Sequence, residues 1–256
     1  MTMRSMLLLL GLIVVAAIRF DLVGRPTPDQ MTTRQTDRPD TAQAYFMDAH
    51  LNQVMVVHAA VVRGDLAAVE PAARALAGLD DGRFPSGAPD QVAAMKAAAQ
   101  RSAEARDVLE AARWTAEMVI ACGNCHRAVG TRPAVPPSAP PRVGGVVGHM
   151  LEHQLAADQL LEGLVVPSDA LWRAGARALM VAPLNPRELP VNSEVRRRLA
   201  PTEERVHRLA TDAIQATDPQ TRAGFYGQVL AGCADCHQLH AKLWGPKPPG
   251  ASARRP

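Results

Sequence analysis

The chain has 256 residues, with 28 Lys and Arg against 25 Asp and Glu for a formal net charge of +3, and 47% of its side chains are hydrophobic. This length suits one large domain or two ordinary ones. The net charge is too small for a nucleic-acid-binding protein. The 21 prolines are concentrated in a few segments, so a wholly disordered chain is disfavoured. Few aromatic and β-branched residues stand beside many Ala, Leu, Arg, Glu and Gln, which favours helices over strands and predicts an all-α protein.

The N-terminal residues 1–24 have the pattern of an export signal. Arg4 precedes an uninterrupted apolar run from Met6 to Ile18, which is short for a membrane span and suits the core of a signal peptide. The run contains no clean A-x-A cleavage site, so an uncleaved membrane anchor stays open. Either interpretation places the remaining chain in the periplasm, soluble or anchored to the inner membrane. Residues 25–40, rich in Pro, Thr, Asp and Arg, are predicted to be a tether.

Four helices are predicted in residues 41–130. The first runs from Thr41 to about Arg63, and Gly64-Asp65 ends it and caps the second. A Gly- and Pro-rich connection leads to the third helix. Asp107 is predicted to cap the fourth, which carries the pentapeptide Cys122-Gly123-Asn124-Cys125-His126.

Residues 131–144 are rich in proline and are predicted to be a linker, because proline cannot continue a helix. Beyond them the pattern repeats. The second pentapeptide follows the first by 111 residues, and Met150-x-x-His153 follows Met47-x-x-His50 by 103. One eight-residue insertion reconciles the two offsets, and a period above 100 indicates a duplicated domain rather than a solenoid. The second pentapeptide is Cys233-Ala234-Asp235-Cys236-His237.

The duplication predicts four further helices in residues 145–244. Asp218 followed by Pro219 is a strong start for the last of them, with Asp as the cap and Pro at the first helical position. The predicted fold is therefore two tandem antiparallel four-helix bundles. Residues 245–256 are predicted to be a flexible, mildly basic tail.

Both pentapeptides read C-x-x-C-H, the attachment signature of a c-type haem. Two cysteine sulfurs bond to the haem vinyl groups, and the adjacent histidine supplies an axial nitrogen to iron. The alternatives are zinc and disulfides, but zinc ribbons place two C-x-x-C units much closer together than these. We therefore predict two covalent haem c groups. They are held by Cys122, Cys125 and His126 and by Cys233, Cys236 and His237.

The other axial position of each iron is predicted from an apolar stripe on the first helix of each copy. His50 and His153 occupy equivalent places on these stripes and are the predicted distal ligands, with Met47 and Met150 as the alternatives. The remaining histidines lack a counterpart in the other copy and are treated as non-ligands, with His149 the strongest exception because it is close to His153. They are His58, His149, His207 and His240.

Trp114 and Phe225 stand eight residues before the first cysteine of each motif. We predict that they pack on the porphyrin or beside it. Ordinary packing in the helical core is an equally good interpretation.

A C-x-x-C-H motif near the end of the fourth helix of a bundle resembles the class II cytochromes c, the cytochrome c′ and cytochrome c-556 group. The resemblance covers about residues 41–130 and 145–244 as a tandem pair. It implies that the first helix of each bundle supplies the distal side, with a Met ligand in the c-556 type and an apolar, ligand-free site in cytochrome c′. This sequence departs from both types by offering His50 and His153.

Three functions remain in order of preference. The first is electron transfer through two low-spin, six-coordinate haems, with redox proteins of the periplasm or membrane as partners. The second is binding or sensing of NO, CO or O2 at an open distal site. The third is an enzyme such as a dihaem peroxidase or reductase, and it is placed last because the distal stripes carry no repeated acid–base constellation.

Overall fold

The computed structural model describes residues 41–133, 143–180 and 193–244. Within these ranges every regular element is helical, which confirms the all-α prediction. The predicted signal or anchor, the tether, most of the linker and the tail lie outside the described residues. No helix in the described ranges is both long and apolar enough to cross a membrane.

The chain divides into two compact units, Met1–Met47 and Asp48–Pro256. All described residues except 41–47 belong to the second unit. We call residues 41–130 the first half of the protein and residues 145–244 the second half.

The helices of the first half begin and end close to the predicted positions. The carboxylate of Asp65 accepts from the Ala68 amide at 3.1 Å, and that of Asp107 accepts from the Glu110 amide at 2.8 Å. Both residues are therefore N-caps, as predicted. The elements are α3 (Thr41–Val62), α4 (Leu66–Ala77), the 3-10 helix η1 (Asp81–Arg83), α5 (Pro89–Ala103) and α6 (Val108–Ala128).

The second half has the same order of helices. Asp218 caps its last helix by accepting from the Thr221 amide at 2.7 Å, directly before Pro219. Much of the extra length of the second half lies in its third helix, which has 21 residues where α5 has 15. The elements are α7 (Gly145–Val165), α8 (Asp169–Leu179), α9 (Ser193–Ala213) and α10 (Pro219–Trp244).

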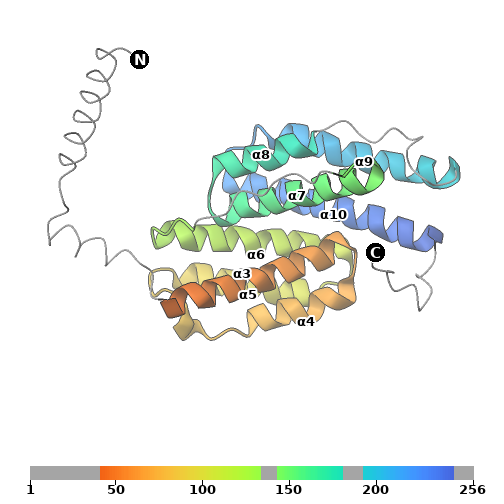
Figure 1. Cartoon of the computed structure of the whole chain (residues 1–256). Helices are drawn as coiled ribbons and strands as arrows, with labels where there is room; N and C mark the ends of the chain where they lie inside the picture. The colour runs from red at the N-terminus through yellow and green to blue at the C-terminus, as the bar shows by residue number, and fades with distance from the viewer. Residues whose placement is uncertain (1–40, 134–142, 181–192, 245–256) are drawn as a thin grey trace, which may run out of the picture. The chain divides into compact units, whose positions relative to one another are not determined.

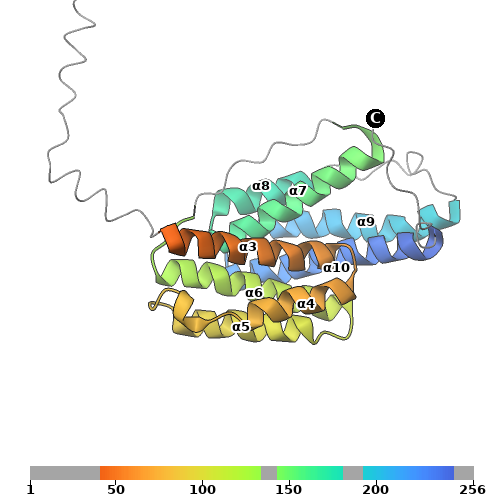
Figure 2. The same ribbon diagram turned by 60° about the horizontal axis from the view of Figure 1, so that its bottom comes forward.

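The helices pack side by side, and α6 joins the two halves (Figures 1 and 2). In the first half α5 packs against α4 and α6, and in the second half α7 packs against α8 and α10, with α9 against α10. Between the halves, α6 lies against both α10 and α7. The predicted apolar stripes lie in the core, since the exposed fraction is at most 4% for Val54, Val57, Val61, Ala157, Leu160 and Leu164.

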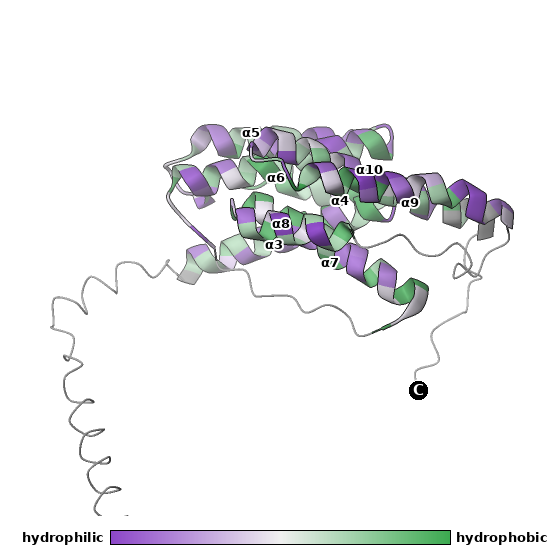
Figure 3. Cartoon of the chain, turned by 90° about the horizontal axis from the view of Figure 1, so that it is seen from above, coloured by the Kyte–Doolittle hydropathy of each residue, from purple (hydrophilic) through white to green (hydrophobic). Residues whose placement is uncertain are grey.

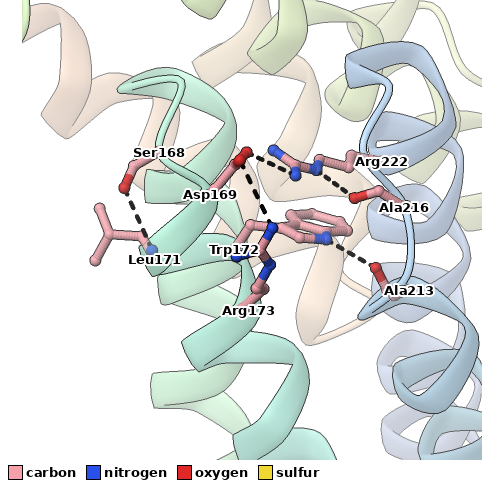
Figure 4. A network of polar contacts seen from close by, with 8 residues as sticks. All are labelled: Ser168, Asp169, Leu171, Trp172, Arg173, Ala213, Ala216 and Arg222. Atoms are coloured by element: carbon pink, nitrogen blue, oxygen red, sulfur yellow. Dashed lines mark hydrogen bonds and ion pairs between the residues drawn. The ribbon is translucent and has the colours of Figure 1, made fainter.

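A polar network ties α8 to the connection between α9 and α10 (Figure 4). The Trp172 indole donates to the Ala213 carbonyl at 2.8 Å, and Arg222 donates to the Ala216 carbonyl at 2.8 Å. Arg222 also pairs with Asp169 at 2.7 Å. These bonds satisfy polar groups that α8 and α10 would otherwise bury at a cost. Hydrophilic residues predominate along α9, which covers α10 (Figure 3).

Candidate haem sites

In the second half the motif residues and the predicted distal ligand line one cavity. Cys233, Cys236 and His237 reach it from α10, and Met150 and His153 reach it from α7. Its empty volume, including the part open to solvent, is about 690 Å³. Its other lining residues are partly aliphatic and partly polar, and most of them belong to α9 and α7.

His153 lines this cavity with a neutral ring. Burial, followed by the neighbouring rings of His149 and His207, lowers the pKa of His153 to about 3, so the ring is neutral. Its Nε2 is buried and has no hydrogen-bond partner among the described residues. A neutral imidazole nitrogen without a partner is the donor that haem iron requires. The donor set around this cavity therefore suits a c-type haem.

The motif histidine of the second half is oriented by the first half. Burial lowers the pKa of His237, and a hydrogen bond to the backbone of Val62, at the C-terminal end of α3, opposes this shift. Because the bond raises the pKa, the ring donates to the carbonyl. A ligating histidine that donates its second nitrogen to a carbonyl has its tautomer and ring orientation fixed.

In the first half, the motif histidine is oriented by a backbone carbonyl of the second half. His126 Nδ1 donates to the carbonyl of Val165, at the C-terminal end of α7, at 2.7 Å. His50 lies near His126, since burial and then the charge of His126 lower the pKa of His50 to about 4. The rings of His50 and Phe84 lie nearly perpendicular to each other, with their centroids 5.5 Å apart. The structure thus brings the predicted proximal and distal residues together in this half too.

The two hydrogen bonds form a reciprocal pair. Val62 and Val165 end the equivalent helices of the two halves, and each bonds to the motif histidine of the other half. In each case the chain at the end of the helix lies close to the helix that carries the motif, as two contacts show. A Cβ on Gly123 would lie 2.1 Å from the Leu164 carbonyl oxygen, and Gln238 donates to the Gly64 carbonyl at 3.0 Å.

The cysteines are four free thiols in the structure. Burial raises the pKa of both Cys122 and Cys233 to about 12 and that of Cys236 to about 11, and it also raises the pKa of Cys125. These thiols are therefore protonated at neutral pH. The i, i+3 spacing within each motif places its two sulfurs on the same side of α6 or α10.

The remaining predicted site residues differ in their surroundings. Met150 lines the cavity of the second half one turn from His153, and Met47 lies on α3 in the other compact unit. Trp114 packs against two guanidinium groups, those of Arg101 and Arg113, at 4.5 and 4.2 Å from the ring centroid. Phe225 is partly buried against the core. Contact of Trp114 and Phe225 with porphyrin stays a prediction.

Two histidines that the sequence set aside lie beside His153. The ring centroid of His149 is 4.2 Å from that of His153, and the centroid of His207 is 5.1 Å from it. The i, i+4 spacing of His149 and His153 in the sequence already placed these two on one helix face. His207 lies on α9, and no spacing pattern indicated that it joins them.

No family model, curated protein or solved structure matches this chain.

Proposed function

We propose that this protein is a dihaem c-type cytochrome that carries electrons in the periplasm or at the outer face of the inner membrane. The observation that carries the proposal is the single cavity lined both by Cys233, Cys236 and His237 and, from a different helix, by His153. A zinc or disulfide role for the cysteines would give no reason for a shared cavity with a buried imidazole in its wall.

In this proposal each half is a four-helix bundle that holds one haem. Helices α3–α6 form the first bundle, and helices α7–α10 form the second. The packing of α5 against α4 and α6, and of α9 against α8 and α10, supports this division. The haem of the second bundle would lie between α7, α9 and α10, because these helices supply nearly all of the cavity lining.

The proposed role of each residue follows from its place. The two cysteines of each motif hold the haem covalently, and His126 and His237 ligate iron from the proximal side. His50 and His153 ligate from the distal side, with Met47 and Met150 as the alternatives. The iron supplies a one-electron couple when the haem is bound. Two fixed protein ligands and partly aliphatic walls keep the coordination and hydration nearly constant, which lowers the reorganisation needed for electron transfer.

Bis-histidine ligation predicts a lower reduction potential than His/Met ligation. The hydrogen bonds from His126 and His237 to backbone carbonyls act in the same direction, because they make each imidazole a stronger electron donor to iron. The expected partners are redox proteins of the periplasm or membrane with low potentials.

The proposal is tested by optical and EPR spectra of the haem-loaded exported protein in both oxidation states, with and without CO. We expect two haems per chain, both low-spin and indifferent to CO. His50→Ala and His153→Ala should each convert one haem to the high-spin form. The matched controls Leu51→Ala and Leu151→Ala, which change neighbouring side chains 37% and 43% exposed, should leave the spectra unchanged. Uptake of CO by the unmodified protein would contradict the electron-transfer proposal and favour gas binding.

A further inference from the structure

Four side chains with metal-binding atoms meet between α7 and α9 in the second half. Ligand nitrogens of His149, His153 and His207 all lie within 4.8 Å of one another. A carboxylate oxygen of Glu203 is 3.3 Å from Nε2 of His149. His149 and His207 are only 7% and 8% exposed, so their clustering is not a chance meeting of solvated surface groups.

The orientation of His207 prepares it as a ligand. Its Nδ1 donates to the Leu179 carbonyl at 2.5 Å, which leaves the lone pair on Nε2. That Nε2 is buried and has no hydrogen-bond partner in the part of the chain that the structure describes. Metal-ligating histidines commonly have this arrangement, with one ring nitrogen bound to a carbonyl and the other directed at the ion. A buried nitrogen left without a partner otherwise costs free energy.

We propose that His149, His153 and His207, with Glu203 as a fourth ligand, bind a divalent first-row transition-metal ion. Three imidazoles and one carboxylate suit Zn²⁺ and the neighbouring ions of that row. With metal–nitrogen bonds of about 2.0–2.1 Å, the ligand nitrogens have to approach one another by roughly an ångström.

The site is confined to the second half. At the offset of 103 residues the first half has Phe46 where the second has His149, and its sequence contains no histidine between His58 and His126. Of the three histidines in the cluster, only His153 therefore has a histidine counterpart in the first half, which is His50. This difference makes the two haem sites chemically unequal.

Metal binding changes the second haem because His153 belongs to both sets of ligands. A metal ion that takes the lone pair of His153 withdraws the distal ligand from iron and opens that haem, while His50 is unaffected. This consequence rests on the proposed haem function, whereas the metal site itself does not. Low metal concentration then corresponds to two six-coordinate haems, and high concentration to one six-coordinate and one open haem.

The test uses the untagged, haem-loaded full chain with Zn²⁺ as the probe, because zinc is redox-inactive and does not absorb in the haem region. Equilibrium dialysis with metal analysis should give one zinc per chain. His149→Phe, which introduces the residue of the first half, and His207→Leu should each weaken zinc binding by at least about tenfold. Leu151→Ala on α7 is the control and should bind zinc normally. Zinc K-edge X-ray absorption should show about three nitrogen and one oxygen neighbours.

The same titration followed optically separates the metal site from the haem function. Without zinc, His149→Phe and His207→Leu should keep the low-spin spectra of the unmodified chain. With zinc, one haem of the unmodified chain should become high-spin and bind CO, and neither variant should respond. Absence of bound zinc, or equal zinc binding by both variants, would overturn the metal site. High-spin spectra in the zinc-free chain with zinc still bound through His149 and His207 would contradict distal ligation by His153 and leave the metal site standing.

Discussion

The buried side chain of His58 links the two halves through a chain of hydrogen bonds. Its Nδ1 is 2.6 Å from the hydroxyl of Tyr226, and its Nε2 is 3.1 Å from a carboxylate oxygen of Asp158. Gln154 donates to the same Asp158 oxygen at 2.7 Å. Burial, and then the charges of Asp158 and Cys233, raise the pKa of Tyr226, so its hydroxyl keeps the proton and donates it to Nδ1. His58 then donates from Nε2 to Asp158.

Tyr226→Phe removes one bond of this chain without changing the shape of the core. We expect a loss of about 1–3 kcal/mol in the free energy of unfolding, because Nδ1 of the fully buried His58 is left without a partner. Urea unfolding measures the change. Tyr45→Phe is the matched control, since that side chain is 76% exposed and should lose almost nothing. Equal losses in the two variants would exclude this role for Tyr226.

Asp169 makes the stability depend on pH in acid. The hydrogen bond from Arg222 and then its charge lower the pKa of Asp169, so the folded state favours the carboxylate more than the unfolded state does. The stabilisation is present above the ordinary pKa of Asp, about 3.9, and is lost as the pH falls through the lowered value. Asp169→Asn should therefore have a shallower decline of melting temperature with pH below about 4.

Asp212→Asn is the control for this measurement, because that exposed residue makes no ion pair within the described ranges. The melting temperature of Asp212→Asn should fall with pH as steeply as that of the unmodified chain. If the melting temperature of Asp169→Asn falls with pH as steeply as that of the unmodified chain, the pair with Arg222 does not contribute to this pH dependence.

At the scale of helices, the sequence predicted most of what depends on neighbouring residues. Asp65, Asp107 and Asp218 cap their helices because each cap involves an amide only three residues away, and such short-range signals are readable in one sequence. The burial of the apolar stripes was also predictable, because it follows from the helical spacing of apolar residues in one sequence. The bonds from the helix ends Val62 and Val165 to the motif histidines were not predicted, since they join different halves and involve backbone atoms that every residue type possesses.

Gly123→Ala tests the bond between His126 and Val165. The added methyl group would lie 2.1 Å from the Leu164 carbonyl oxygen, so the end of α7 must move away from α6. Under the proposed function, weakening of the bond makes His126 a poorer electron donor, and the potential of the first haem should rise while that of the second stays unchanged. Spectroelectrochemistry resolves the two couples.

Asn124→Ala is the control for this variant. It changes the same pentapeptide, but the Asn124 side chain accepts from Arg127 on its own helix. Its potentials should equal those of the unmodified protein. A shift of the second haem alone in Gly123→Ala would contradict the assignment of this bond to the first.

At the scale of the whole molecule, contacts between residues far apart in sequence were beyond prediction. His58 and Tyr226 are separated by 168 residues, and each lacks a marked pattern around it. His207 joins His149 and His153 from another helix, and it has no histidine counterpart in the first half that would mark it as a ligand. The sequence therefore predicted the two attachment motifs and their distal candidates, but not the cluster of His149, His153 and His207.

The two halves should remain together when the chain between them is cut. The packing of α6 against α10 and α7, with the bonds of His58, His126 and His237 across the halves, forms an extensive interface. A protease site inserted within residues 134–142 and cleaved after folding should leave both fragments co-eluting in size-exclusion chromatography. Cleavage of the denatured chain is the control and should separate them. Separation of the natively cleaved fragments would show that the linker alone holds the halves.

The reciprocal bonds between helix ends and motif histidines impose an order on maturation. The chain is made from its N-terminus, so Val62 exists long before His237 needs it, whereas His126 is made 39 residues before Val165. The carbonyl that bonds to the second motif is therefore made before that motif, whereas the carbonyl that bonds to the first motif is made after it. A chain that stops after the first motif would leave the His126 ring without the Val165 carbonyl that orients it.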